Sequence, residues 1–516
     1  MGTVQPSHPA LSARVVANEH PASLRQLPVS YGAVDPRTQR RPKLSELGTN
    51  TLFLGTTGCG KSTALKLLMR SVLEPVDGRY AANFRALVFD AKTDLLPFFS
   101  GLGLSHEREV ILTNPFDMRC AAWDVARDVT GYPDAVTLAE LLVPPREHDH
   151  NPFWENAVRE VVTAVIHGLN QPRPPHGRRP WTFPELIAVL DHREHRVAVM
   201  ERTQHGREAT ANYFDSNDER LSGNIEATLK ACVSPHRLVA AAWKRAQASF
   251  SFREWARGGG VLLIGNHYAH EETTKRLNNL LLRFAIAALM ERPGDSSDVT
   301  TWLFLDELRQ AGRFPSFSTL LTQGRSKGLR TVITAQGLST LRAAFPTAEV
   351  DEVLNNCGEK CLMQLGSPED AEWAQRLFST VKRIKVGKHE SDDQTIRPSY
   401  TYNEVTESKL EPQAFFELAS AQGTGRGLDA YYHAMGGVHS RTTTPGSVVR
   451  PLLEDVEQKG KATHAFLPRP EAHFEPPVLS PHEQHLLGLG GGDTPVEGEP
   501  ASHSSDFRMP PLPAAR

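Results

Sequence analysis

Over residues 44–113 the hydrophobic pattern alternates short, β-rich apolar runs with longer stretches of helical periodicity. Strands are predicted at 51–54, 86–89 and 109–112, and a helix over 64–73. This alternation is typical of a parallel sheet with helices on its faces. Asp90 ends the second strand at the sheet edge where ligands of open α/β sheets bind, although a helix cap or turn would explain it equally well.

Between residues 123 and 250 the β pattern gives way to helical periodicity. Helices are predicted at 134–142, 153–169, 183–190 and 224–241, which together indicate an inserted all-helical subdomain. The sheet pattern then resumes. Further strands are predicted at 260–265, 301–305, 329–334 and 360–365, with helices at 272–291, 348–356 and 370–378.

The two ends of the chain differ from the middle in composition. Residues 1–45 are rich in proline and end in a basic cluster, which indicates a flexible lead-in. Beyond about residue 450 the chain turns to Pro, Gly, Ser and His, so we expect a disordered tail in which 481–489 forms a short helix on a partner.

Charge and cysteine content narrow the class of protein further. The chain has 57 Lys and Arg against 60 Asp and Glu, so its overall charge does not indicate binding to nucleic acid. A locally basic channel that binds nucleic acid would be compatible with this composition. Five cysteines in 516 residues favour a reducing compartment. No apolar run reaches the roughly 18 residues of a membrane-spanning helix, so we expect a soluble, cytoplasmic protein.

The most informative motif lies between the first predicted strand and helix. It reads Gly55, Thr56, Thr57, Gly58, Cys59, Gly60, Lys61, Ser62, Thr63. A Gly-x-x-x-x-Gly-Lys-Ser loop in this context is a phosphate-binding loop: main-chain N–H groups converge on phosphate oxygens, Lys61 reaches the β- and γ-phosphates, and Ser62 ligates Mg²⁺. The helix N-terminus adds favourable dipole charge. We therefore predict that residues 55–63 bind ATP and Mg²⁺.

A second motif supplies the carboxylates that ATP hydrolysis needs. The apolar strand at 301–305 ends in Asp306 and Glu307. Asp306 is predicted to hold the magnesium shell, and Glu307 to orient and deprotonate the attacking water. The chain is accordingly predicted to be a P-loop ATPase.

Hydrolysis also requires a positive charge near the γ-phosphate, often an arginine from a neighbouring subunit. The candidates are Arg309, Arg313, Arg325 and Arg330, and sequence alone does not choose among them. Gln336 follows the strand at 329–334 and is a candidate γ-phosphate sensor, with an ordinary loop glutamine as an equal alternative.

These motifs together resemble the TrwB/TraD type of conjugative coupling ATPase, over roughly residues 48–390. The resemblance is carried by the phosphate loop, the strand ending in Asp90, the segment 113–123 and the block 302–336. Its most specific parts are the strand before Asp306, the run 321–330 and the Ala335-Gln336 pair. The resemblance implies that Arg325 is the arginine finger and Gln336 the sensor.

Coupling proteins of this type are hexameric RecA-like motors with an all-α domain inserted between the two nucleotide motifs. The resemblance implies an α/β RecA-like P-loop domain with a mainly parallel sheet, formed by residues 46–120 and 250–445. The inserted all-α domain is predicted at 121–249. A flexible segment at 1–45 and a disordered tail at 450–516 are predicted at the two ends of the chain.

The implied function is ATP hydrolysis coupled to recruiting or translocating DNA to a type IV secretion system. Implied partners are DNA, a relaxase or other secretion substrate, secretion-system components and further copies in a homohexamer. Typical members begin with transmembrane helices and this sequence begins with a polar stretch, so we expect a form without them, cytoplasmic or held at the inner membrane by a partner. Two alternatives are a nucleotide-gated receptor for protein cargo and a related cytoplasmic DNA translocase, for example in phage defence.

Overall fold

The structure is a computed structural model, and it describes most of the chain between residues 50 and 489. The described ranges are 50–74, 85–106, 109–145, 152–172, 181–215, 218–292, 296–312, 317–378, 380–389, 399–408, 410–421, 425, 427–434 and 438–489. The predicted flexible segment at 1–45, the tail at 490–516 and Arg313 lie outside the described residues.

The chain divides into two compact units that are interleaved in sequence. Unit 1 spans Met1–Tyr80, Trp302–Gln310 and Leu321–Lys459, and unit 2 spans Ala81–Thr301, Ala311–Leu320 and Gly460–Arg516. Four elements of the described residues cross the sequence boundaries between the units: β7 (Ser296–Leu305), α12 (Leu308–Ala311), α13 (Phe317–Gln323) and α18 (Gly446–Gly460).

Unit 1 is built on parallel strands around β1. Its elements are β1 (Thr51–Leu54), α1 (Lys61–Leu73), η4 (Gly324–Ser326), β8 (Lys327–Ala335), α14 (Leu338–Ala344), α15 (Thr347–Asn356), β9 (Glu359–Leu362), α16 (Pro368–Arg376), β10 (Thr380–His389), β11 (Ser399–Ser408), α17 (Gln413–Phe416), β12 (Leu428–Ala434), β13 (Val438–Thr444) and α18 (Gly446–Gly460). Strand β1 pairs in parallel with β8 on one side and with β9 on the other. Every residue of β1 is buried, as expected for a strand covered on both faces.

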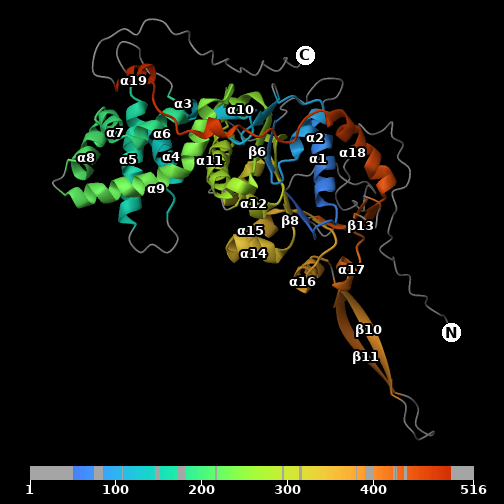
Figure 1. Ribbon diagram of the computed structural model, residues 1–516. Coiled ribbons are helices and arrows are strands. Elements are labelled where there is room, and N and C mark those ends of the chain that lie inside the picture. Colours follow the sequence, from blue (N-terminus) through green and yellow to red (C-terminus); the bar gives the residue numbers. More distant parts are fainter. Residues whose placement is uncertain are drawn as a thin grey trace. The chain divides into compact units, whose positions relative to one another are not determined.

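Two antiparallel pairs follow the parallel strands of unit 1. Strand β12 pairs with β9 and with β13, so an antiparallel hairpin completes this side of the sheet. Strands β10 and β11 form a separate two-stranded ribbon that projects beyond α17 (Figure 1). The hydrophobic pattern of the sequence does not predict these four strands.

Unit 2 has its own parallel strands and most of the helices. Its elements are β2 (Arg85–Asp90), α2 (Leu95–Gly101), β3 (Val110–Leu112), β4 (Ala121–Trp123), α3 (Val125–Asp128), α4 (Tyr132–Leu142), α5 (Phe153–Leu169), α6 (Phe183–Asp191), α7 (Arg193–Met200), α8 (Gln204–Tyr213), α9 (Glu219–Lys244), β5 (Ala248–Phe250), α10 (Phe252–Gly258), β6 (Gly260–Gly265), η3 (Tyr268–His270), α11 (Glu271–Met290), η5 (Glu471–Phe474) and α19 (Pro481–Leu487). Strand β6 pairs in parallel with β2 and β3, and β4 with β5.

The helices α3 to α9 lie in sequence between β4 and β5, where an inserted helical subdomain was predicted. Helix α6 begins at a capping box, in which the Thr182 hydroxyl accepts the Glu185 N–H and the Glu185 carboxylate accepts the Thr182 N–H. Its next residues, Phe183 to Leu190, are all buried, so the helix is held on every side. The boundaries of the predicted domains stay a prediction.

The strand predictions are confirmed by β1, β2, β3, β6, β7, β8 and β9, with shifts at the ends. The helix predictions are confirmed by α1, α4, α5, α6, α9, α11, α15 and α16. Helices α7 and α8 were not predicted, because each is short and has few apolar residues. No helix within the described residues is long and apolar enough to span a membrane.

The prediction of a disordered tail from residue 450 is wrong as far as residue 489. Helix α18 extends to Gly460, and the following segment returns along unit 2. Main-chain hydrogen bonds join Met118 to Leu467 (2.9 Å) and Arg469 to Phe116 (2.9 Å). The buried Arg469 guanidinium donates to the Pro115 carbonyl through Nε, at 2.9 Å. These bonds order a segment whose composition alone indicates disorder.

The predicted short helix in the tail is present as α19. Its N-terminus is capped by Ser480, whose hydroxyl accepts the Glu483 N–H. Within unit 2, Lys244 at the end of α9 donates to the Glu483 carboxylate at 3.1 Å, and Arg202 donates to the Leu487 carbonyl. The helix therefore packs on this chain's own helices.

Candidate nucleotide-binding site

The glycine loop at 55–60 joins β1 to α1 and requires glycine at three of its positions. Gly58 and Gly60 have φ of 82° and 109°, in the left-handed region that favours glycine. A Cβ on Gly55 would lie 2.7 Å from Cys59 Sγ, and one on Gly60 would lie 2.9 Å from Leu428 Cδ2. Three glycines are therefore required by the backbone and by its close neighbours.

Side chains of the loop are fixed by neighbouring strands and by the loop itself. Lys61 Nζ donates to the Gly55 and Thr56 carbonyls at 2.6 and 2.9 Å, so its ammonium lies over the loop. The Thr56 hydroxyl donates to the Gln364 carbonyl at 3.1 Å. Thr57 is exposed, and Ser62 and Thr63 lie half-buried in the first turn of α1.

Cys59 is the exception among the predicted nucleotide-binding side chains. Its thiol is fully buried, with Sγ 3.7 Å from Met363 Sδ. Burial raises the pKa of the Cys59 thiol, and the charge of Lys61 acts in the opposite direction. Its thiol is thus a packing group, and only its main chain is available to a phosphate.

The predicted carboxylates lie at the end of β7, in contact with the end of β8. Asp306 is buried, and the Thr334 hydroxyl donates to its Oδ1 at 3.3 Å. The same hydroxyl accepts the Glu307 main-chain N–H at 2.9 Å. Glu307 has φ of 60°, one of two non-glycine residues with positive φ among the described residues. Thr334 was not identified from the sequence, although its place two residues before Gln336 was a usable signal.

The structure brings Glu307 and Gln336 into direct contact. Gln336 Nε2 donates to Glu307 Oε2 at 3.0 Å. Burial raises the pKa of the Glu307 carboxyl, while the Gln336 hydrogen bond and the charge of Lys61 act to lower it. Lys61, Glu307 and Gln336 therefore share one electrostatic environment, although they come from three distant parts of the sequence.

Three of the four arginine candidates lie within the described residues, and these three separate by exposure. Arg330 is buried, 4% exposed, and donates to its own strand's Leu329 carbonyl at 2.7 Å. Burial and the nearby charge of Arg325 lower the pKa of Arg330. Arg325 and Arg309 are exposed, and Arg325 lies in η4.

A segment from the late part of unit 1 also contacts the glycine loop, and sequence reasoning missed it. The Ala421 N–H donates to the Gly58 carbonyl at 3.1 Å. Two residues earlier, the Ala419 N–H donates to the buried Asp429 carboxylate at 3.0 Å. Asp429 is paired in turn with Arg441 of β13. The antiparallel hairpin is thereby connected to the loop.

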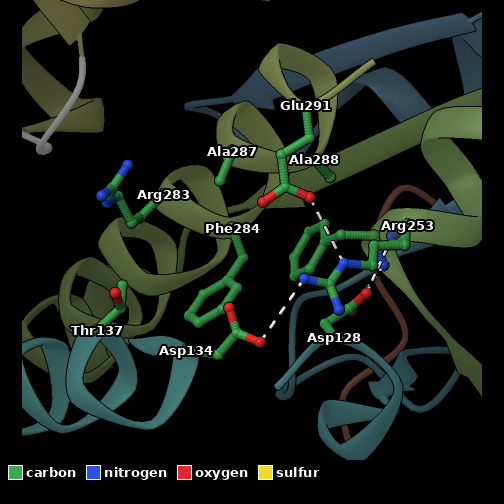
Figure 2. Close-up of a pocket in the computed structure, with 10 residues that line it drawn as sticks. Asp128, Asp134, Thr137, Arg253, Arg283, Phe284, Ala287, Ala288 and Glu291 are labelled. Atoms are coloured by element: carbon green, nitrogen blue, oxygen red, sulfur yellow. Dashed lines mark hydrogen bonds and ion pairs between the residues drawn. The ribbon is translucent and has the colours of Figure 1, made fainter. Parts of the chain in front are cut away.

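Unit 2 contains a separate cavity of 140 Å³ that none of the predicted site residues lines. Figure 2 shows Arg253 between the carboxylates of Asp134 and Glu291, at 3.7 and 3.6 Å. Asp128 accepts the Trp123 indole N–H at 2.6 Å and the Ser251 hydroxyl at 2.8 Å. The Arg253 and Asp128 side chains that line the cavity thus bond to other groups of this chain. We interpret the cavity as a polar packing feature between α4, α10 and α11.

The glycine loop lies between a buried strand and a helix, and the two carboxylates follow β7, which β8 separates from β1 in a mainly parallel sheet. This arrangement defines a P-loop α/β protein of the RecA-like kind. The profile of the type IV secretion-system coupling protein DNA-binding domain matches residues 43–415. The chain belongs to this family.

Known proteins agree with this assignment. The coupling protein TraD of Escherichia coli (strain K12) is 21% identical over 349 residues, which cover 66% of this chain and 45% of TraD. This chain thus corresponds to less than half the length of that relative.

Among solved structures, the bacterial conjugative coupling protein TrwBdeltaN70 in its unbound monoclinic form superposes with a TM-score of 0.60 at 18% identity, covering 86% of this chain and 94% of that one. TrwB in complex with ADP and Mg²⁺ gives 0.56 at 19% identity, covering 80% and 88%. At these identities the likeness establishes the fold.

Proposed function

We propose that this chain is a DNA-binding ATPase of the coupling-protein type, which recruits or translocates DNA to a type IV secretion system. The observation that carries the proposal is the meeting of Lys61, Glu307 and Gln336 in one site. A phosphate loop alone would fit a nucleotide-binding scaffold. A glutamate positioned by a glutamine beside the loop lysine supports hydrolysis as well.

The residues present fit ATP and Mg²⁺. The loop is a cradle in which a Cβ at Gly55 or Gly60 would collide with neighbours, while Gly58 has open space beside it. Lys61 and the main chain of 55–63 would hold the phosphates, and Ser62 and Asp306 would hold Mg²⁺. The bound metal would neutralise charge on the transferred phosphoryl group. Glu307 would accept the proton of the attacking water, in an orientation maintained by Gln336.

Arg325 is the proposed arginine finger, acting on the nucleotide of a neighbouring copy in a homohexamer. Its exposed position in η4 supports this role, because only a side chain at the surface of one subunit can contact the nucleotide of another. The buried Arg330 is unsuited to it. Arg309 lies next to the carboxylates within the same subunit, and its charge acts on Glu307.

The DNA, relaxase and secretion-system partners are proposed from family membership and from the named relatives. We propose a location in the cytoplasm or, through a partner protein, at the inner membrane, where a coupling protein would meet a secretion system. Because the chain corresponds to 45% of TraD, the activities of that whole protein are not transferred with it.

The test is the ATPase rate of purified protein with and without DNA. We expect DNA to stimulate the rate, and Lys61→Ala and Glu307→Gln each to reduce it by about a hundredfold or more. Glu307→Gln should retain nucleotide binding, and Lys61→Ala should lose it. The matched control is Glu372→Gln, an exposed glutamate of α16, which should hydrolyse ATP at the wild-type rate.

Two outcomes would contradict the proposal. Absence of DNA binding by a folded oligomer at low salt would exclude the DNA function. Nucleotide binding without turnover would favour the nucleotide-gated receptor instead. The pH dependence is an internal check: because the pKa of Glu307 is raised, kcat should fall as the pH is lowered through a value above 4.5.

A further inference from the structure

Near the C-terminal end of β8, the hydroxyl of Thr334 bonds both to the Asp306 carboxylate and to the main chain of Glu307. Thr334 is 1% exposed, and its partner across the parallel pair is Phe53 of β1, immediately before the glycine loop. A hydroxyl has one donor and two acceptor lone pairs. Thr334 uses its donor on Asp306 Oδ1 (3.3 Å) and one acceptor on the Glu307 N–H (2.9 Å).

The bond between the Glu307 N–H and the Thr334 hydroxyl holds a residue with an unusual main-chain conformation. Glu307 adopts a φ of 60°, in the left-handed region that is unfavourable for a non-glycine residue. Such a conformation persists only when neighbouring groups maintain it. The Thr334 hydroxyl holds the N–H of Glu307, and Gln336, two residues further along, holds its carboxylate at 3.0 Å. The main chain and the carboxylate of Glu307 are therefore both held by the C-terminal end of β8 and the residue that follows it.

We propose that Thr334 is a positioning residue for ATP hydrolysis, which sets Asp306 and Glu307 relative to each other. This inference rests on the proposed ATPase function. The Thr334 hydroxyl orients the proposed metal ligand by bonding to the Asp306 carboxylate. It orients the proposed base by bonding to the main chain of Glu307. The hydroxyl itself contacts neither nucleotide nor water in this role. Valine has the same shape without the hydroxyl, and serine retains the hydroxyl with less bulk.

The same strand provides a matched control three residues earlier. Thr331 is also 1% exposed, and its hydroxyl has no hydrogen-bond partner among the described residues. Thr331→Val and Thr334→Val thus make the same chemical change at the same depth in one strand. They differ in whether the hydroxyl bonds to the Asp306 carboxylate and the Glu307 main chain.

The experiment compares Thr334→Val, Thr334→Ser and Thr331→Val in the full chain. The readouts are kcat, the dissociation constant of a fluorescent ATP analogue in EDTA, the same constant with Mg²⁺, and the unfolding temperature. We expect Thr334→Val to lower kcat by about 10- to 100-fold, the range for hydrogen bonds to charged groups. Binding in EDTA should stay within about twofold, because the phosphate loop is unchanged, while the gain in affinity from Mg²⁺ shrinks. Thr334→Ser should recover most of kcat, and Thr331→Val should match the wild type.

Several outcomes of this experiment would overturn the positioning role of Thr334. A Thr334→Val enzyme with wild-type kcat, or a serine variant as impaired as the valine variant, overturns the positioning role. Equal losses in kcat and in EDTA binding show a merely structural role and also overturn it. If Thr334→Val does not fold, Thr334→Ser decides through kcat and the Mg²⁺ effect on binding: recovery of both supports the inference and loss of both overturns it. A wild-type protein that binds no nucleotide, or binds without turnover, instead refutes the proposed function and removes the basis of the inference.

Discussion

Glu359 offers a quantitative test of the fold that is independent of nucleotide. It begins β9, pairs in register with Thr51 of β1, and is 8% exposed. Burial raises the pKa of its carboxyl to about 7, with the charge of Lys360 acting in the opposite direction. Replacing it by glutamine keeps the shape of the side chain and removes its titration.

The magnitude follows from the two pKa values. A rise from 4.5 to about 7 is roughly 2.5 units, or about 3 kcal/mol at ~1.4 kcal/mol per unit. Because the folded-state pKa is the higher one, the folded chain binds the proton more tightly. The stability that this proton contributes is complete below pH 4.5 and is lost as the pH rises through about 7. Glu359→Gln should therefore match the wild type near pH 4.5 and exceed it by up to about 3 kcal/mol above pH 7.

The assay is urea unfolding of both proteins at several pH values, read by hydrogen–deuterium exchange of peptides that contain β1 and β9. This readout reports on unit 1 alone. The exposed Glu372→Gln on α16 is the control for the same substitution at the surface of unit 1. A difference for Glu359→Gln that stays constant between pH 5 and pH 8 would refute the reasoning, because it would mean that Glu359 does not titrate in this range.

Two further substitutions test the glycine loop and the C-terminal segment. Gly60→Ala places a Cβ 2.9 Å from Leu428 at a φ of 109°, so nucleotide binding should be lost in a titration with a fluorescent ATP analogue; the control Gly223→Ala, exposed in α9 with open space around it, should bind normally and be more stable by about 0.5–1 kcal/mol. Arg469→Met removes the donors that the Pro115 and Asp117 carbonyls use and should destabilise the docked segment by about 3 kcal/mol, seen as faster limited proteolysis within 461–489. The exposed Lys461→Met should be cleaved at the wild-type rate, and equal cleavage of both variants would show that Arg469 does not hold the segment.

The parts of the site that are predictable from sequence are those encoded by local patterns. The glycine loop and the Asp306-Glu307 pair each follow an apolar run, and parallel strands end at the same sheet edge. The contact between Gln336 and Glu307 follows from this edge rule. The left-handed backbone of Glu307 and the role of Thr334 do not, because they depend on how two strand ends meet.

Other features depend on contacts that composition does not reveal. The segment at 461–489 is ordered by main-chain bonds to residues 116–118 and by one buried arginine, whereas its Pro and His content resembles that of a disordered tail. Arg330 looked equivalent to Arg325 in sequence, and only its place inside β8 separates them. The strands β10 and β11 mix charged and apolar residues without strict alternation, so their pattern is weak.

The pairing of β1 also constrains how the chain acquires its site during synthesis. Strand β1 and the glycine loop are made early, whereas their partners β8 and β9, and Ala421 against Gly58, come late in the chain. Loop closure over such separations is slow compared with local helix formation. The apolar side chains of residues 51–73 therefore stay exposed to solvent until β8 and β9 have been synthesised and can pair with β1. A nascent or truncated chain that ends before this point should be a substrate for chaperones and should bind no nucleotide.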